Sequence, residues 1–588
     1  YLVGRYEQRA GRGEALAHLQ AAAKADPKLV PAQLALAEIA LDGGDKDAAL
    51  AQVNSALAID PEHLRGRLFL LFLRADDSDA ASIDKSLRGL TDAMKKAGAI
   101  DRALDALVRA RVLRRQGQRD AAGQAVETAS NAGADEPRLL AWMAREALAV
   151  GKLPLAQHLA SQALSAAPDV AQNRRLLAGI LIERSDGEHA LQLLDKLPAD
   201  DSEAQIMKAQ AALLSSDETA WRAGLDGLTQ LQAAKRDATR VGALRVRLEA
   251  KLTPGHAVVE RARALAHAAP GDPEALLALA EAGLAAHEPA TTQAALKQRF
   301  AVEPDDPNAY YLLGRARRMA ADASGAESDF RRAIELAPGH GDALLALAEL
   351  LLDEGKYADA DGVYQELATR GGSAAQGRLG RVEALIALGR LDDAQVQLDA
   401  LPEAQHASAP YRLSAARLAL ARNKPGDALT SLRPLVDTQA DKVSVMTLYG
   451  DALVAAEQFE PAATAYDAAL AIDPELPEAL IGRAEVQLHA NKVKEALALL
   501  QKAKDALPKR IRPPSVQARR LMVTGEAYAQ RNKRGDQEAA RDALRDAVKF
   551  PNPPSAAYFV LAESLGGRAN PEARAAYERY LELDPHGR

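Results

Sequence analysis

The stretch VSVMTLYGDALVAAEQFEPAATAYDAALAIDPEL, residues 443–476, decides the fold of this chain. It is rich in Ala and Leu, which are strong helix formers. The stretch PNAYYLLGRARRMAADASGAESDFRRAIELAPGH, residues 307–340, repeats its pattern of apolar, small, aromatic and proline positions at the same offsets. These positions are Tyr310, Leu313, Gly314, Ala326, Phe330, Ala333 and Pro338 in one stretch, and Met446, Tyr449, Gly450, Ala462, Tyr466, Ala469 and Pro474 in the other.

Proline spacing extends this pattern along most of the chain. Prolines recur 34 residues apart at Pro27 and Pro61, at Pro270, Pro304 and Pro338, and at Pro474 and Pro508. A fixed period of this length indicates a stack of repeated helical units, about seventeen of them here. The register is clear for residues 30–63, 103–170, 273–510 and 554–588, and poorer for 64–102 and 171–272.

The period and the shared positions resemble the tetratricopeptide repeat. This resemblance implies an all-α fold, a right-handed superhelical solenoid of about seventeen 34-residue helix–turn–helix repeats. The residue types agree with it, because small residues such as Gly314 and Ala326 let two helices approach closely. We expect Phe330 and Tyr466 to fill the space between successive hairpins. Four glycines lie where the first helix of a repeat must end, at Gly44, Gly151, Gly355 and Gly389.

The quality of the repeat divides the chain into four parts. Residues 1–170 form an N-terminal array with an incomplete first repeat, and 171–272 form degenerate helical repeats. Residues 273–508 form the regular array, and 509–588 form terminal repeats with longer, basic loops. Neither end shows the polar capping element that a solenoid needs, so we expect the chain to be a segment of a larger protein.

Composition excludes several classes of function. The net charge is −7, which argues against nucleic-acid partners. The 588 residues include no cysteine, which excludes disulfides, thiolate catalysis and Cys-bound metals. No apolar run reaches the ~20 residues of a membrane-spanning helix. Phosphate loops, paired metal-binding histidines and nucleophile elbows are absent. The sequence therefore predicts a protein that is not an enzyme and has no cofactor or metal.

The resemblance places partner binding on the concave face of the first helices. The regular repeats predict a groove there, with leucines, acidic residues and a basic interruption. The groove residues are Leu277, Glu281, Tyr311, Arg315, Arg318, Leu345, Glu349, Leu379 and Glu383. Two interpretations remain open. In the first, the leucines fill the space between neighbouring first helices, and the charged side chains form ion pairs along the stack of repeats. In the second, the groove binds a partner peptide with apolar and basic side chains.

One basic cluster coincides with the lengthened loops. It consists of Lys509, Arg510, Arg512, Arg519 and Arg520. It is either a solvated linker or a docking point for an acidic protein or an anionic polysaccharide.

Long Ala-rich arrays of this kind resemble those of bacterial envelope and exopolysaccharide-secretion proteins. The resemblance implies a non-catalytic protein–protein interaction scaffold, located in the periplasm, that organises such an assembly. Two alternatives stay open. One is a cytoplasmic or motility-related adaptor, and the other is a regulatory segment of a larger enzyme, a transferase or kinase whose catalytic domain lies outside this chain.

Overall fold

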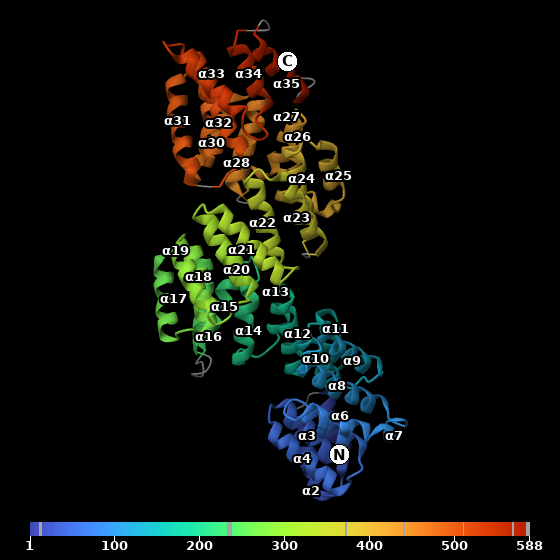
Figure 1. Cartoon of the computed structure of the whole chain (residues 1–588). Coiled ribbons are helices and arrows are strands. Elements are labelled where there is room, and N and C mark those ends of the chain that lie inside the picture. The colour runs from blue at the N-terminus through green and yellow to red at the C-terminus, as the bar shows by residue number, and fades with distance from the viewer. Residues whose placement is uncertain are drawn as a thin grey trace. The chain divides into compact units, whose positions relative to one another are not determined.

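The computed structural model describes residues 1–10, 14–231, 238–370, 373–438, 441–509, 511–566 and 570–583. Within these residues it contains 35 α-helices and three short 3-10 helices, and no strand (Figure 1). The prediction of an all-α fold is confirmed. The chain divides into two compact units, which we call the N-terminal unit (Tyr1–Thr253) and the C-terminal unit (Pro254–Arg588).

The N-terminal unit contains sixteen of the helices. They are α1 (Leu2–Ala10), α2 (Ala15–Ala25), α3 (Val30–Asp42), α4 (Lys46–Ile59), α5 (Leu64–Arg74), α6 (Ala80–Arg88), α7 (Thr91–Met94), α8 (Ala99–Arg115), α9 (Arg119–Asn131), α10 (Pro137–Ala149), α11 (Leu153–Ala166), α12 (Ala171–Glu183), α13 (Gly187–Leu194), α14 (Ser202–Leu213), α15 (Glu218–Gln230) and α16 (Ala238–Leu252).

The C-terminal unit contains the other nineteen and the 3-10 helices. They are α17 (His256–Ala268), α18 (Pro273–Ala285), α19 (Pro289–Phe300), α20 (Pro307–Met319), α21 (Ala323–Leu336), α22 (Gly341–Asp353), α23 (Tyr357–Arg370), α24 (Ala374–Ala387), α25 (Leu391–Asp399), η1 (Glu403–Gln405), α26 (Ala409–Ala421), α27 (Pro425–Leu432), η2 (Arg433–Leu435), α28 (Lys442–Ala455), α29 (Phe459–Ile472), α30 (Pro477–His489), α31 (Val493–Ala506), η3 (Leu507–Lys509), α32 (Pro514–Arg531), α33 (Asp536–Ala547), α34 (Ser555–Ser564) and α35 (Pro571–Leu583).

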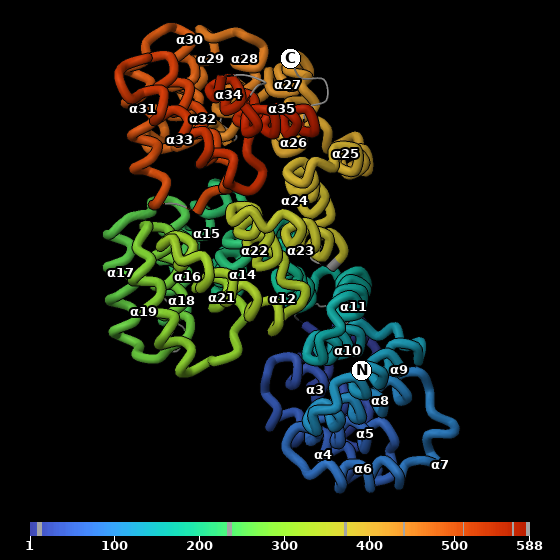
Figure 2. The backbone as a smooth tube through the Cα atoms, turned by 45° about the horizontal axis from the view of Figure 1, so that its top comes forward, coloured from blue at the N-terminus to red at the C-terminus, as the bar shows by residue number. Residues whose placement is uncertain are grey.

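Successive helices pair in the way that the 34-residue period predicts. The first helix of a repeat packs against the second, as α20 does against α21 and α28 against α29, and also contacts the first helix of the next repeat. The backbone trace of each unit therefore winds as a stack of helix pairs (Figure 2). Within the described residues, seven such pairs lie in the N-terminal unit and nine in the C-terminal unit, once the four-residue α7 and the helices α16 and α17 at the unit boundary are set aside. Helix α7 lies in 64–102, where the repeat register is poor.

Large aromatic residues pack directly against small residues of neighbouring helices. Phe330 and Tyr466 are fully buried. A Cβ atom added at Gly314 would lie 2.5 Å from the Phe330 ring, and one added at Gly450 would lie 2.6 Å from the Tyr466 ring. These distances are shorter than any van der Waals contact, so glycine is required for the helices to approach this closely. Tyr466 also lies against Gly482 of the next repeat, and Phe330 shares an apolar cluster with Leu344 and Leu347 of the next repeat, so the predicted position of both rings between successive hairpins is confirmed.

In most of the described repeats, the turn between the two helices passes through one residue in the left-handed backbone region. Gly355 and Gly389 have φ angles of +77° and +73° there. Other repeats place a residue with a Cβ atom at the same position, for example Ala321 with φ of +60°. Left-handed backbone is unfavourable for a residue with a Cβ atom by roughly 1–2 kcal/mol. The turn therefore contains strain that differs from repeat to repeat.

This difference in backbone strain predicts that two substitutions at the turn position have opposite effects on hairpin stability. Ala321→Gly is expected to stabilise the α20–α21 hairpin by about 1 kcal/mol, and Gly389→Ala to destabilise the α24–α25 hairpin by about as much. Native-state hydrogen exchange of each hairpin in the full chain measures the local opening free energy. Equal effects of the same sign would show that the turn geometry does not govern hairpin stability.

Candidate functional site

The predicted groove residues lie on four successive first helices of the C-terminal unit. Leu277 and Glu281 lie on α18, Tyr311, Arg315 and Arg318 on α20, Leu345 and Glu349 on α22, and Leu379 and Glu383 on α24. Each of these helices contacts the next, α18 to α20, α20 to α22 and α22 to α24. Because successive repeats share one geometry, residues 34 positions apart form rows across the four helices.

The three groove leucines are half-buried. Leu345 packs against the apolar cluster that contains Phe330 and Leu347. Leu379 packs against the cluster that contains Val382 and Leu385. The leucines therefore contribute to contacts between repeats and still keep part of their apolar surface accessible.

Two of the groove glutamates, Glu349 and Glu383, are bound by arginines of neighbouring first helices. The Arg318 guanidinium lies 2.9 Å from Glu349 and 2.6 Å from Asp353. Burial alone would lower the pKa of Arg318, but Asp353 and Glu349 outweigh it and the pKa is raised. Glu383 forms the equivalent ion pair with Arg417 on α26. A ladder of ion pairs thus joins α20 to α22 and α24 to α26.

Tyr311 and Arg315 form the basic interruption of the groove. The exposed Arg315 guanidinium lies 5.6 Å from the centre of the Tyr311 ring. The centres of the Tyr311 and His340 rings are 5.4 Å apart. Burial raises the pKa of the Tyr311 phenol. Arg315 therefore offers a cation on an aromatic support at the surface of the groove.

The ladder continues beyond the predicted groove. Arg519 on α32 lies 3.0 Å from Asp451 on α28 and 2.7 Å from Glu485 on α30. Burial acts to lower the pKa of Arg519, and the two carboxylates raise it well above the ordinary value. Glu526, also on α32, makes no hydrogen bond or ion pair with any residue that the structure describes. Burial and Glu485 raise the pKa of Glu526 to about 7.

The predicted basic cluster does not form a single surface patch. Lys509 pairs with Glu475 at 2.8 Å, and Arg512 pairs with Glu478 at 3.1 Å. Arg519 belongs to the ladder described above. Arg520 is 6% exposed and donates from Nε to Gln517 Oε1. Arg510 lies outside the described residues. The cations that adjoin in sequence are thus distributed among different carboxylates and helix faces.

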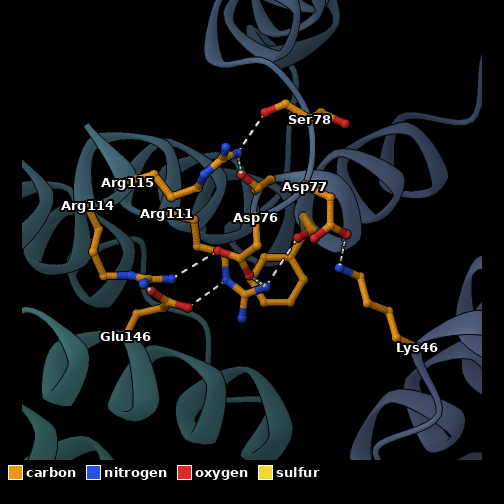
Figure 3. A network of polar contacts seen from close by, with 10 residues as sticks. Lys46, Asp76, Asp77, Ser78, Arg111, Arg114, Arg115 and Glu146 are labelled. Carbon is orange, nitrogen blue, oxygen red and sulfur yellow. Dashed lines mark hydrogen bonds and ion pairs between the residues drawn. The ribbon is translucent and has the colours of Figure 1, made fainter. Parts of the chain in front are cut away.

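The N-terminal unit contains an ion-pair network that sequence reasoning missed (Figure 3). Arg111 and Arg114 on α8 converge on the buried Glu146 of α10, at 2.5 and 3.3 Å. Both also reach Asp76, and the Arg111 guanidinium lies 3.8 Å from the centre of the Phe72 ring. The signal in the sequence is a pair of basic residues, Arg111 and Arg114, on the first helix of one repeat, and the acidic Glu146 on the first helix of the next.

The N-terminal unit also contains cavities. One of about 430 Å³ is lined by α1, α2, α3, α10 and the start of α12, and includes Asp42, Arg138 and Arg145. Another of about 360 Å³ lies beside Arg5 and Glu38. Burial raises the pKa of Glu38, against the effect of Arg5 and Arg138. These volumes are in the range of ligand sites.

A group of residues with metal-ligand chemistry lies at the start of the N-terminal unit. Ligand atoms of Glu7, Glu14 and His18 lie within 4.8 Å of one another. His18 Nδ1 and Glu7 Oε2 are 2.6 Å apart, so a hydrogen bond already occupies one ligand atom of each. The group could not be predicted from the sequence, because its members come from α1 and from the start of α2. None of the helices in the described residues has the length and apolar character needed to cross a bilayer.

Comparisons with known proteins agree with this architecture. The tetratricopeptide repeat profile matches residues 5–63, 142–204, 345–410, 413–477 and 450–511. No curated protein matches the chain. A crystal structure of the APC/C hetero-tetramer Cut9–Hcn1 contains a chain that is 14% identical, with 87% of this chain and 95% of that one covered at a TM-score of 0.50.

Two further solved structures are similar over parts of the chain. A tetratricopeptide repeat protein from Parabacteroides merdae is 17% identical over 40% of this chain and 93% of its own, with a TM-score of 0.34. Yeast Tom70 is 15% identical over 82% of this chain and 97% of its own, with a TM-score of 0.31. The Cut9 likeness shows a shared fold. The repeat profile, matched in five regions of the chain, shows that this chain belongs to the tetratricopeptide repeat superfamily.

Proposed function

We propose that this protein is a non-catalytic scaffold of a bacterial envelope assembly, and that it works in the periplasm in the synthesis or export of an exopolysaccharide. The tetratricopeptide fold supports a role in protein–protein interaction. The absence of cysteine from all 588 residues suits a protein that works outside the cytoplasm. On this proposal the partners are proteins of the assembly, and the groove of the C-terminal unit holds a segment of one of them.

The observation that supports the groove is a row of half-buried leucines beside shared carboxylates. Leu345 and Leu379 keep accessible apolar surface, and burying a leucine side chain fully is worth roughly 1.5–3 kcal/mol. Glu349 and Glu383 are each bound by one arginine, and a Lys or Arg of a partner would share them. A segment with apolar and basic side chains fits this surface, and an isolated peptide would bind in the micromolar range or more weakly.

The test starts from a partner identified by capture from an envelope extract and then purified. The double exchange Leu345→Ser and Leu379→Ser is expected to weaken binding at least about tenfold, because each serine removes apolar contact area. Helicity by circular dichroism should not change. The matched control is Val396→Ser with Ile472→Ser, two exposed apolar residues on the second helices α25 and α29. An equal loss of partner binding in both double variants would exclude the groove as the binding site.

A second double variant separates the contribution of charge to binding from that of apolar contact. Glu349→Gln with Glu383→Gln should weaken binding modestly and flatten its dependence on salt, because charges at an interface contribute more to association rate than to affinity. Recovery of polysaccharide synthases or exporters would support the envelope assignment. Recovery of cytoplasmic motility proteins alone would replace it by the adaptor alternative.

A further inference from the structure

Helices α3 and α10 of the N-terminal unit contact each other, although two helix pairs, α5–α6 and α8–α9, lie between them in the chain. The Trp142 indole of α10 donates a hydrogen bond to Asp42 Oδ1 of α3 at 3.4 Å, and Arg138 forms an ion pair with the same carboxylate. Gln172 of α12 donates to the backbone carbonyl of Asp42 at 3.1 Å. These contacts close a turn of the superhelix within the N-terminal unit.

The C-terminal unit closes a wider turn. Pro514, the first residue of α32, lies so close to the α22–α23 turn that a Cβ atom added at Gly355 would be 3.0 Å from its ring. Ile511 packs against the apolar cluster that includes Leu351. At the same position of the next repeat, a Cβ atom built at Gly389 meets no described atom within 4 Å. Four helix pairs, α24–α25 to α30–α31, lie between these contacts, so the turn of the N-terminal unit is the tighter one.

The tight turn encloses the cavity of about 430 Å³. Helix α10 contributes Arg138, Ala141 and Arg145 to the wall of this cavity. These residues are three and four positions apart, so they lie on one face of the helix. The two arginines therefore flank a small side chain, and the wall leaves room over Ala141 for a group of a ligand.

Three polar groups of the cavity wall lack a hydrogen bond within the described part of the chain. Arg138 Nη1 is buried and makes no hydrogen bond, and its ion pair with Glu38 is long, at 3.7 Å. Arg145 and Asp169 are exposed, and they form no hydrogen bond or ion pair with each other or with another described residue. A buried N–H group without an acceptor is unfavourable, and a ligand in the cavity can supply the acceptor.

The unpaired charges indicate the chemistry of that ligand. The other two acidic residues of the wall, Asp42 and Glu136, each have an arginine partner already. Arg145 and Asp169 are therefore the cation and the anion that remain. A ligand carboxylate would accept charge-assisted hydrogen bonds from the guanidiniums, and a ligand ammonium would donate one to Asp169. A molecule with one charge of each sign satisfies both residues.

We propose that this cavity is a binding site for a small zwitterion, an amino acid or dipeptide with free amino and carboxyl ends. Its carboxylate lies over Ala141 between Arg138 and Arg145, and its ammonium group lies against Asp169. The volume of the cavity is sufficient for such a molecule. The groove of the proposed function lies in the C-terminal unit, so this proposal goes beyond that function and either can fail without the other.

The first experiment titrates the full chain with the dipeptide L-alanyl-L-alanine in a calorimeter. We expect one site with a Kd on the order of 0.1 mM, as suits a ligand of this size. The dipeptide amide lacks the carboxylate and the N-acetyl dipeptide lacks the ammonium group, so each should bind at least about tenfold more weakly. A dipeptide that does not bind saturably, or equal binding of all three compounds, would overturn the proposal.

A second experiment assigns the two ends of the ligand to their residues. Arg145→Gln should weaken binding of the dipeptide about tenfold and leave binding of its amide at the parent level, because the amide has no carboxylate to lose. Asp169→Asn should weaken the dipeptide similarly and leave the N-acetyl form unchanged. Both residues are exposed, so helicity by circular dichroism should match the parent.

The matched control is Arg119→Gln, which changes an exposed arginine of the second helix α9 that does not line the cavity. This variant should bind the dipeptide like the parent. Equal weakening by Arg119→Gln and Arg145→Gln would contradict the proposal, because it would show a general effect of charge. Equal weakening of the dipeptide and both modified forms by Arg145→Gln would contradict the placement of the carboxylate.

Discussion

Tyr466→Ala is expected to lower the stability of the surrounding repeats by about 3–5 kcal/mol, the range for removal of a buried aromatic side chain. Tyr466 on α29 is fully buried between first helices. Cβ atoms added at Gly450 on α28 and Gly482 on α30 would lie 2.6 and 2.3 Å from it. The ring therefore fills a space that two glycines create, and the backbone around it has no side chain with which to close the cavity.

The hydroxyl group of Tyr466 also contributes to stability through a hydrogen bond, and a second variant measures this contribution alone. Tyr466 donates a hydrogen bond to Asp451 Oδ1 at 2.7 Å. Tyr466→Phe keeps the ring and is expected to lower stability by only about 1–2 kcal/mol, because Arg519 still pairs with Asp451. Native-state hydrogen exchange of the full chain should show the loss of protection confined to α28–α30, since each repeat contacts mainly its neighbours. A uniform increase across the C-terminal unit would contradict this local picture.

Asp329→Asn is expected to stabilise the α20–α21 hairpin by about 2 kcal/mol at pH 7–8. Asp329 is 6% exposed, and its Oδ2 forms no hydrogen bond, although it lies 3.3 Å from Arg317 Nε in an ion pair. Burial raises the pKa of this carboxyl from 3.8 to about 6, although Arg317 acts in the opposite direction. A neutral side chain of the same shape removes the unfavourable buried charge.

The pH dependence provides the decisive measurement for Asp329. Because the pKa is raised in the folded protein, the folded state binds more protons than the unfolded state between pH 3.8 and about 6. The parent hairpin should therefore lose stability as the pH rises through this window. The Asp329→Asn hairpin should lack this slope, and the two proteins should be equally stable near pH 4. An advantage of the variant that is constant with pH would exclude titration of Asp329 as the cause. Glu335→Gln, at an exposed position of the same helix, is the control for a general charge effect.

Much of the fold could be predicted from the sequence because repeat architecture is a local property. The offsets of Gly314, Phe330 and Ala333 within one period specify how two helices approach, and neighbouring repeats obey the same rule. The left-handed turn residue is equally local, and Gly355 and Gly389 identified it. The resemblance to the tetratricopeptide family then followed from positions that pack within and between adjacent hairpins.

The tertiary structure decided which side chains share a surface. Lys509 and Arg512 adjoin in sequence, yet they pair with different carboxylates a full repeat away. The ladder of Arg318, Arg417 and Arg519 forms only when first helices stack, because each of these arginines reaches a carboxylate on another helix.

The contact of Ile511 and Pro514 with the α22–α23 turn is the clearest case. The sequence by itself determined the period, the helix pairs and the glycine at position 355, because those depend on residues less than one repeat apart. Only the winding of the superhelix decided that Pro514 would cover Gly355 and leave Gly389 open. The angle between successive repeats accumulates over many units, and no local pattern of residues specifies that sum.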